Sequence, residues 1–198
     1  VRAAKNNRHC VSLCDIMILA VKPQVLQQVI EEIHSVTDKK TLVISIAAGV
    51  QMARIEHLFK KPLPVIRVMP NMPALIGAGA AALAKGQHAT DDNLATAEAI
   101  LAAVGIIVRT EEKFLDAVTA LSGSGPAYIF YVTEAMVKAG SEAGLPEDVA
   151  KKLALQTVLG AAKLMVETGE DPGALRRKVT SPGGTTEAAL KVMTERKL

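Results

Sequence analysis

The chain has 198 residues, of which 49% are hydrophobic, and 23 basic against 20 acidic residues give a net charge of +3. This length and apolar content predict one large or two smaller domains with a substantial core, and they exclude global disorder. Aromatic residues make up only 3% of the chain and Trp is absent, which argues against a nucleic-acid surface of stacked rings. The small, evenly spread charge argues against any polyanion partner.

The two cysteines, Cys10 and Cys14, cannot form a disulfide framework, and their use fits a reducing, cytoplasmic setting. His9 lies beside them, but a single cluster without a second ligand pair favours buried thiols, so we expect no metal site. Turn sequences interrupt every apolar run before it reaches membrane length, and no apolar signal segment is present. We therefore expect a soluble protein without a membrane partner.

Apolar runs of strand length alternate with helical spacing in the first half of the chain. Strands are expected at Asp15–Val21, Leu42–Ile46, Val65–Val68 and Gly105–Thr110. Helical spacing follows in three segments: Gln24–Ile33, Met52–Leu58 and Asp91–Val104. Continuous apolar strands separated by helices are typical of a parallel α/β sheet that is buried on both faces and has right-handed crossovers.

The strand patterns stop near Phe114, where long helical patterns begin. We place the boundary near Glu112 and Lys113, which gives domains of residues 1–113 and 114–198. One helix is expected to start with Pro126 in a first-turn position, and its first turns are apolar nearly all round. A second helical segment follows from Pro146. We expect them to be buried against a second subunit, with a monomeric bundle as the alternative.

Two glycine-rich segments resemble nucleotide motifs only superficially. Gly77, Gly79 and Ala82 have the spacing of a dinucleotide-binding fingerprint, but no strand precedes them and Lys85 and Gly86 come too early for a helix. A Gly/Ala-rich strand or turn is expected instead. LSGSGPAY lacks the Lys-Ser/Thr ending of a phosphate loop and is interpreted as a flexible interhelical turn. The four histidines lie away from the Ser- and Thr-rich turns, which disfavours hydrolase chemistry.

Two strand ends are better candidates for a nucleotide site. AVKPQ (Ala20–Gln24) and IAAGV (Ile46–Val50) each follow a buried strand, and open α/β sheets bind their ligands at the carboxyl ends of strands. Met69–Asn71 ends the third strand and is expected to form the floor of the same crevice. Together these segments predict a nucleotide crevice.

A second candidate site lies in VTSPGGTTEAALKVM, near the C-terminus. Pro182, Gly183 and Gly184 suit a tight turn, and either Thr185 or Thr186 can cap the helix that follows. Backbone N–H groups without helical partners then gather at the helix start, where an anion is favoured. The sequence therefore predicts an anion site in this turn.

In this order, ILAVKPQ, ISIAAGV, RVMPNMP, DAVTALSGSGPAY, GLPEDVA and VTSPGGTT resemble the pyrroline-5-carboxylate reductase family. The resemblance implies a Rossmann-type parallel α/β sheet followed by an all-α dimerisation domain. It also implies reduction of 1-pyrroline-5-carboxylate to L-proline, the last step of proline biosynthesis, with NADPH or NADH. The implied assembly is a homodimer, with decamers of five dimers also found in the family.

The resemblance also assigns binding residues by position. The segments that match the family's cofactor contacts are Asn7, Ala20, Val21, Lys22, Pro23, Ile46, Ala47 and Ala48. Backbone N–H groups of Gly183, Gly184 and Thr185 are expected to hold the substrate carboxylate. The hydroxyl of Thr186 is expected to face the ring nitrogen, which makes Thr186 the catalytic residue.

The chain departs from the family pattern in several places. The initial strand and GxGxxG turn are not in the sequence, so about 45 to 50 residues of a typical member, and a final helix, are expected to be missing. Met72 stands where Thr is common, and Arg176, Arg177 and Lys178 make the approach to the turn basic.

Two alternatives to the reductase remain at this point. The chain could retain only the dimerisation module, without nucleotide binding. A Rossmann dehydrogenase of the hydroxyacid type is the other alternative, which the combination of SPGGTT with SGSGPAY disfavours.

Overall fold

The computed structural model describes residues 3–196 and divides the chain into two compact units, Val1–Tyr128 and Ile129–Leu198. Each unit is described by itself below. The boundary predicted near Glu112 and Lys113 falls within the first unit, in a short 3₁₀ turn, η3 (Glu112–Phe114). The division into domains of residues 1–113 and 114–198 stays a prediction.

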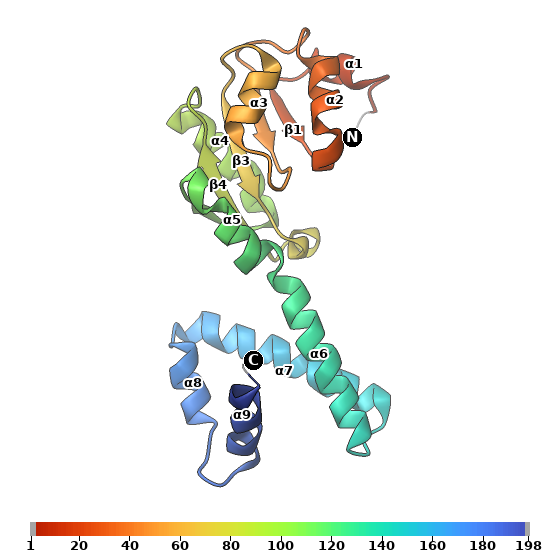
Figure 1. Ribbon diagram of the computed structural model, residues 1–198, viewed down its shortest axis with the longest axis vertical. Helices are drawn as coiled ribbons and strands as arrows, with labels where there is room; N and C mark the ends of the chain where they lie inside the picture. The colour runs from red at the N-terminus through yellow and green to blue at the C-terminus, as the bar shows by residue number, and fades with distance from the viewer. Residues whose placement is uncertain (1–2, 197–198) are drawn as a thin grey trace. The chain divides into compact units, whose positions relative to one another are not determined.

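In the described part of the first unit, five strands form one sheet in the order β1-β2-β3-β4-β5 (Figure 1). The strands are β1 (Ile16–Leu19), β2 (Leu42–Ser45), β3 (Val65–Met69), β4 (Gly79–Lys85) and β5 (Gly105–Arg109). All neighbouring pairs are parallel except β3 and β4, which are antiparallel. The mostly parallel α/β sheet is thus confirmed.

The Gly/Ala-rich segment, for which a strand or turn was expected, is the antiparallel strand β4. Only the 3₁₀ turn η1 (Met72–Ile76) separates β4 from β3. Parallel strands need a crossover of a dozen or more residues, so this connection is too short for one, and the chain reverses instead.

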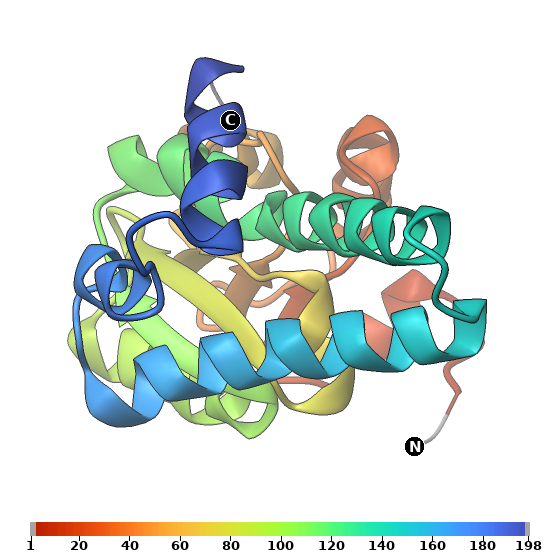
Figure 2. The same ribbon diagram turned by 90° about the horizontal axis from the view of Figure 1, so that it is seen from below.

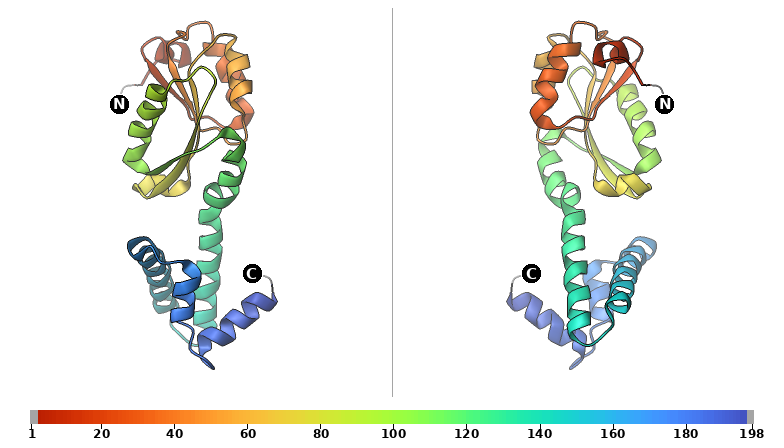
Figure 3. Two further views of the ribbon diagram at one scale, coloured as in Figure 1. Left: turned by 90° about the vertical axis from the view of Figure 1, so that its left-hand side faces the viewer. Right: turned by 90° about the vertical axis from the view of Figure 1, so that its right-hand side faces the viewer.

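Helices cover the two faces of the sheet (Figure 3). The helices α2 (Pro23–Ile33) and α3 (Met52–Phe59) pack on one face, where Leu26, Ile30 and Phe59 are fully buried. On the other face, Leu94 and Ala97 of α4 (Asp91–Leu101) join a second apolar cluster. The remaining elements of this unit are α1 (Asn7–Val11), η2 (Ala102–Val104), α5 (Leu115–Val118) and the π-helix η4 (Thr119–Gly123).

The two edge strands are not buried on both faces: β1 buries only alternate residues, and β5 has no buried residue. All four residues of β2 are buried, as predicted, but the outward side chains of β1, Ile16 and Ile18, are 38% and 46% exposed. Ile106 and Val108 of β5 are exposed as well. Burial of these two strands on both faces was therefore a wrong expectation, because the apolar cluster around α4 includes no residue of β1 and the cluster around α2 and α3 includes none of β5.

The second unit continues from α6 (Gly125–Glu142), which crosses the border, through α7 (Glu147–Thr168), α8 (Pro172–Lys178) and α9 (Thr185–Glu195) (Figure 2). Within the described chain α6 has no buried residue, and α7 buries only Ala150 and Ala154. Large apolar side chains are therefore exposed on both helices: Ile129, Phe130, Tyr131, Leu153, Leu159 and Val166. This exposure argues against the monomeric bundle. None of the helices between residues 3 and 196 has the length and apolar character needed to cross a membrane.

A tight contact between β4 and β5 generates a stability prediction. Gly105 has a φ of +153° and pairs with Gly79, and a Cβ at Gly105 would lie 2.0 Å from the Gly79 carbonyl oxygen. Gly105→Ala is therefore expected to lower the free energy of unfolding by about 3 kcal/mol, measured by urea denaturation. Gly125→Ala is the matched control because a Cβ there meets no atom within 4 Å. Equal losses in the two variants would contradict the prediction.

Candidate functional site

The predicted cofactor segments leave the sheet at one edge. Because β1 and β2 are parallel and pair Leu19 with Ser45, the segments after these strands start side by side. The Ile46 N–H donates to the Leu19 carbonyl oxygen at 3.2 Å, which joins the two segments. The structure thus brings together two groups of predicted cofactor residues: Ala20, Val21, Lys22 and Pro23 with Ile46, Ala47 and Ala48.

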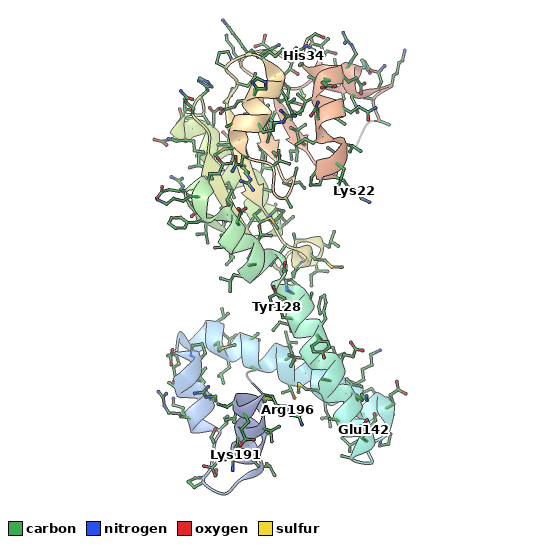
Figure 4. The ribbon with its side chains drawn as sticks, in the orientation of Figure 1. Lys22, His34, Tyr128, Glu142, Lys191 and Arg196 are labelled. Carbon is green, nitrogen blue, oxygen red and sulfur yellow. The ribbon has the colours of Figure 1, made fainter. Side chains whose placement is uncertain are left out.

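This edge has features that suit a phosphate-bearing ligand. Lys22 is the N-cap of α2 and Pro23 is its first residue, so the helix begins directly after the strand-end segment. Figure 4 shows Lys22 and His34 at opposite ends of α2. The second segment ends where α3 begins, and Gly49 takes a φ of +73° between them. Two helix N-termini and small exposed residues such as Ala20 and Ala48 allow a phosphate to approach the backbone.

Asn7 is placed differently from the other predicted cofactor residues. It is the first residue of α1, and its side chain donates to Glu32 Oε2 of α2 at 2.8 Å. Glu32 lies nine residues beyond Pro23, about 13.5 Å along the helix axis. The structure therefore does not bring Asn7 to the strand-end edge, and its contact with the adenosine side stays a prediction.

Asn71, at the end of β3, fixes the LSGSGPAY segment. Its Oδ1 accepts the Ala80 N–H at 2.9 Å, and its Nδ2 donates to the Ser122 carbonyl oxygen at 3.2 Å and the Ser122 Oγ at 3.3 Å. Ser122 belongs to the π-helix η4, and π-helical turns are frequent at functional sites. Because Gly123 also lies directly against Met69, this segment is a held turn rather than the flexible turn that was expected. The sequence analysis did not predict the contact between Asn71 and Ser122. Its only indication was the expectation that Met69–Asn71 forms the floor of the crevice.

The SPGG turn places its N–H groups at the start of α9, but not with the expected cap. Gly184 is the N-cap and Thr185 is the first helical residue, so the prediction of a threonine cap was wrong. Gly is one of the residues favoured at an N-cap, and the backbone of Gly184 is extended there, with φ −83° and ψ 170°. Thr185 and Thr186 therefore lie in the first turn of the helix.

An internal carboxylate already binds this turn. The Gly183 N–H donates to Glu187 Oε2 at 2.7 Å, and the Gly184 N–H donates to the Ser181 carbonyl oxygen at 3.0 Å. Glu187 is the third residue of α9, the position from which a Glu reaches back in a capping box. Two of the three N–H groups predicted to hold the substrate carboxylate thus have partners within the chain.

An open cavity of about 820 Å³ lies beside the turn. Its lining includes Gly183, Gly184 and Glu187 together with the basic side chains of Arg176, Arg177 and Lys191. Lys178, the third member of the basic run, pairs with Glu170. The arrangement offers cationic groups to an anion at the turn.

The cysteines form no part of these sites. Cys10 is exposed and Cys14 is partly buried, and both are free thiols. Burial, followed by the nearby Cys10 and Asp15, raises the pKa of the Cys14 thiol. Among residues 3–196, no cluster of three His, Cys, Asp or Glu side chains is placed to hold a metal ion.

Comparison with known proteins places the chain among oxidoreductases that carry a helical dimerisation domain. Residues 1–49 match the model "NADP oxidoreductase coenzyme F420-dependent", and residues 112–198 match "Pyrroline-5-carboxylate reductase dimerisation". A pyrroline-5-carboxylate reductase of Synechocystis is 47% identical over 193 residues, which cover 98% of this chain and 72% of that protein. The chain belongs to the pyrroline-5-carboxylate reductase family.

Solved structures agree with this assignment. The pyrroline-5-carboxylate reductase of Coxiella burnetii has a TM-score of 0.88 and 41% identity, with 98% of this chain and 73% of that chain covered. The Plasmodium falciparum pyrroline carboxylate reductase, solved with NADP bound, has a TM-score of 0.88 and 30% identity, with 96% and 71% covered.

Proposed function

We propose that this protein reduces 1-pyrroline-5-carboxylate to L-proline with NADPH as the hydride donor, as the last step of proline biosynthesis. The observation that carries the proposal is the contact between Gly183 and Glu187, because it makes the SPGG turn a carboxylate-binding turn in a cavity with two arginines. The family assignment supplies the reaction class, and the NADP-bound Plasmodium relative supports NADPH over NADH.

The cofactor site in this proposal is the strand-end edge of the first unit. The α2 N-terminus with Lys22 binds a phosphate, and the small residues of the second segment, Ala47 and Ala48, let the dinucleotide lie against the backbone. Asn7, which does not lie at this edge, contacts the adenosine side farther from the strand ends. The remaining contacts come from Ala20, Val21, Pro23 and Ile46. When bound, the reduced nicotinamide supplies the hydride that C5 of the cyclic imine receives.

The substrate site is the turn before α9. Backbone N–H groups of Gly183, Gly184 and Thr185 hold the substrate carboxylate once Glu187 leaves the Gly183 N–H and the Gly184 N–H leaves the Ser181 carbonyl oxygen. Arg176 and Arg177 add favourable charge. Thr186 orients the ring nitrogen through its hydroxyl. An iminium substrate carries its own proton, so this residue works by positioning and no strong acid is needed.

Self-association completes the proposal. The chain contains the family's dimerisation domain, and its helices α6 and α7 expose Ile129, Phe130 and Leu159. Burial of these side chains against the same helices of a second copy yields the homodimer, from which a decamer of five dimers can form.

The reaction is tested by following the absorbance of NADPH with and without 1-pyrroline-5-carboxylate. We expect NADPH consumption that depends on the imine and yields proline, in this chain or in a version extended at its N-terminus. Oxidation by neither form would overturn the proposal. A stable dimer that binds no NADPH in either form would instead favour the alternative of a dimerisation module.

Thr186→Ala tests the residue that orients the ring nitrogen. We expect kcat to fall about tenfold, the effect of one hydrogen bond to a reacting group, with the KM for the imine little changed. Thr186→Ser retains the hydroxyl and serves as the control. Unchanged steady-state kinetics in the alanine variant would contradict this role.

Glu187→Gln tests competition between the internal carboxylate and the substrate. The neutral amide neither repels an incoming carboxylate nor holds the Gly183 N–H as strongly, so the KM for the imine should fall several-fold at unchanged kcat. Glu195→Gln removes a carboxylate from the same cavity without touching the turn and is the control. An equal fall in both variants would point to general charge, and a higher KM in Glu187→Gln would refute competition.

A further inference from the structure

Arg67, a buried cation, lies on the middle strand of the sheet. Arg67 of β3 is only 5% exposed, and its backbone lies between Ser45 of β2 and Ala84 of β4. A guanidinium in such a place must be paired, since an isolated buried charge is strongly unfavourable.

Glu112 is the principal partner of this cation. Its Oε1 lies 3.0 Å from Arg67 Nη1, and the Glu112 side chain is 29% exposed. Asp116 is a weaker partner, because its Oδ1 lies 3.7 Å from Nη2 and its side chain is 87% exposed. The ion pair thus fixes the Glu112 carboxylate at one place against the sheet.

The same oxygen of Glu112 also caps a helix. Glu112 Oε1 accepts the backbone N–H of Met52, the first residue of α3, at 2.7 Å across 60 residues of sequence. First-turn N–H groups have no partner within their own helix, and the positive helix end favours a carboxylate. Glu112 therefore holds the start of α3 in place.

The start of α3 is also the end of the second predicted cofactor segment. The beginning of that segment is held at the sheet by the Ile46 N–H on the Leu19 carbonyl oxygen and by the Ala47 N–H on Ser45 Oγ at 3.4 Å. Its far end is held through Met52 and Glu112. The segment is thus fixed at both ends, and one of the two anchors comes from outside the sheet.

We propose that Glu112, oriented by Arg67, is a positioning residue for the nicotinamide cofactor: it holds the 46–51 segment in its binding conformation by capping α3. The inference rests on the proposed cofactor site. A fixed segment binds more tightly because less conformational freedom is lost when the ligand binds. Loss of the cap weakens cofactor binding, whereas the helix start before α9 keeps its own contacts.

Two double variants separate this role from simple stabilisation. Arg67→Met with Glu112→Gln removes both charges but keeps an amide oxygen for the Met52 N–H, and Arg67→Met with Glu112→Leu removes the acceptor as well. We expect the Leu form to bind NADPH about tenfold more weakly than the Gln form in calorimetric titration, the effect of one lost hydrogen bond. Urea midpoints of both variants show how far the fold itself has changed.

A single substitution at Glu111 is the control for these double variants. Glu111→Gln removes the neighbouring carboxylate, which is exposed and pairs with Lys113, and should leave NADPH affinity unchanged. Equal NADPH affinity in the two double variants would overturn the positioning role, even if the unaltered protein turns over the imine. Conversely, if this chain and its N-terminally extended version bind NADPH but neither reduces the imine, the proposed reaction is overturned, while a tenfold NADPH difference between the double variants would still support Glu112. No NADPH binding by either form would overturn both proposals.

Discussion

Parallel pairing of β1, β2 and β3 is the constraint on which the candidate sites of the first unit depend. Parallel strands point their carboxyl ends to one edge, so three segments distant in sequence must begin there. Two of them lead into helices whose N-termini face the same edge, and the third carries Asn71. Because β2 and β3 are almost wholly buried, their register cannot slip without exposing apolar side chains. The buried core therefore fixes where these three segments begin.

Arg67 is a charged residue within that apolar core, and its ion pair with Glu112 has a large effect on stability. Breaking a buried pair by removing one member costs about 3–5 kcal/mol, a large share of the about 5–15 kcal/mol that stabilises a typical domain. The partner comes from η3, which follows the last strand of the sheet. Pairing thus ties the chain leading to the helical unit to the centre of the sheet. The single Glu112 oxygen then couples this link to α3.

Much of the fold could be predicted because long apolar runs report strands directly: β1, β2, β3 and β5 were all expected. The pattern could not show which face the helices leave open, so the exposure of Ile16 and Ile18 was missed. The side-chain pairs could not be predicted either, because their members are far apart in the sequence. Arg67 and Glu112 are 45 residues apart, and Asn71 and Ser122 are 51 apart. The roles of the predicted site residues rest on family resemblance and stay predictions.

The turn before α9 shows why local chemistry alone does not define a substrate. Its geometry favours any carboxylate, and Glu187 has the advantage of being tethered four residues from the Gly183 N–H. A tethered group acts at a high effective concentration, so a free anion can displace it only with additional contacts. Arg176 and Arg177 in the adjoining cavity can supply charge. The directional contact to a ring nitrogen is the role proposed above for Thr186. Selectivity at this turn would then arise from the N–H groups, the arginine charges and the ring contact acting together. A simple carboxylate that lacks the ring would gain only the first two.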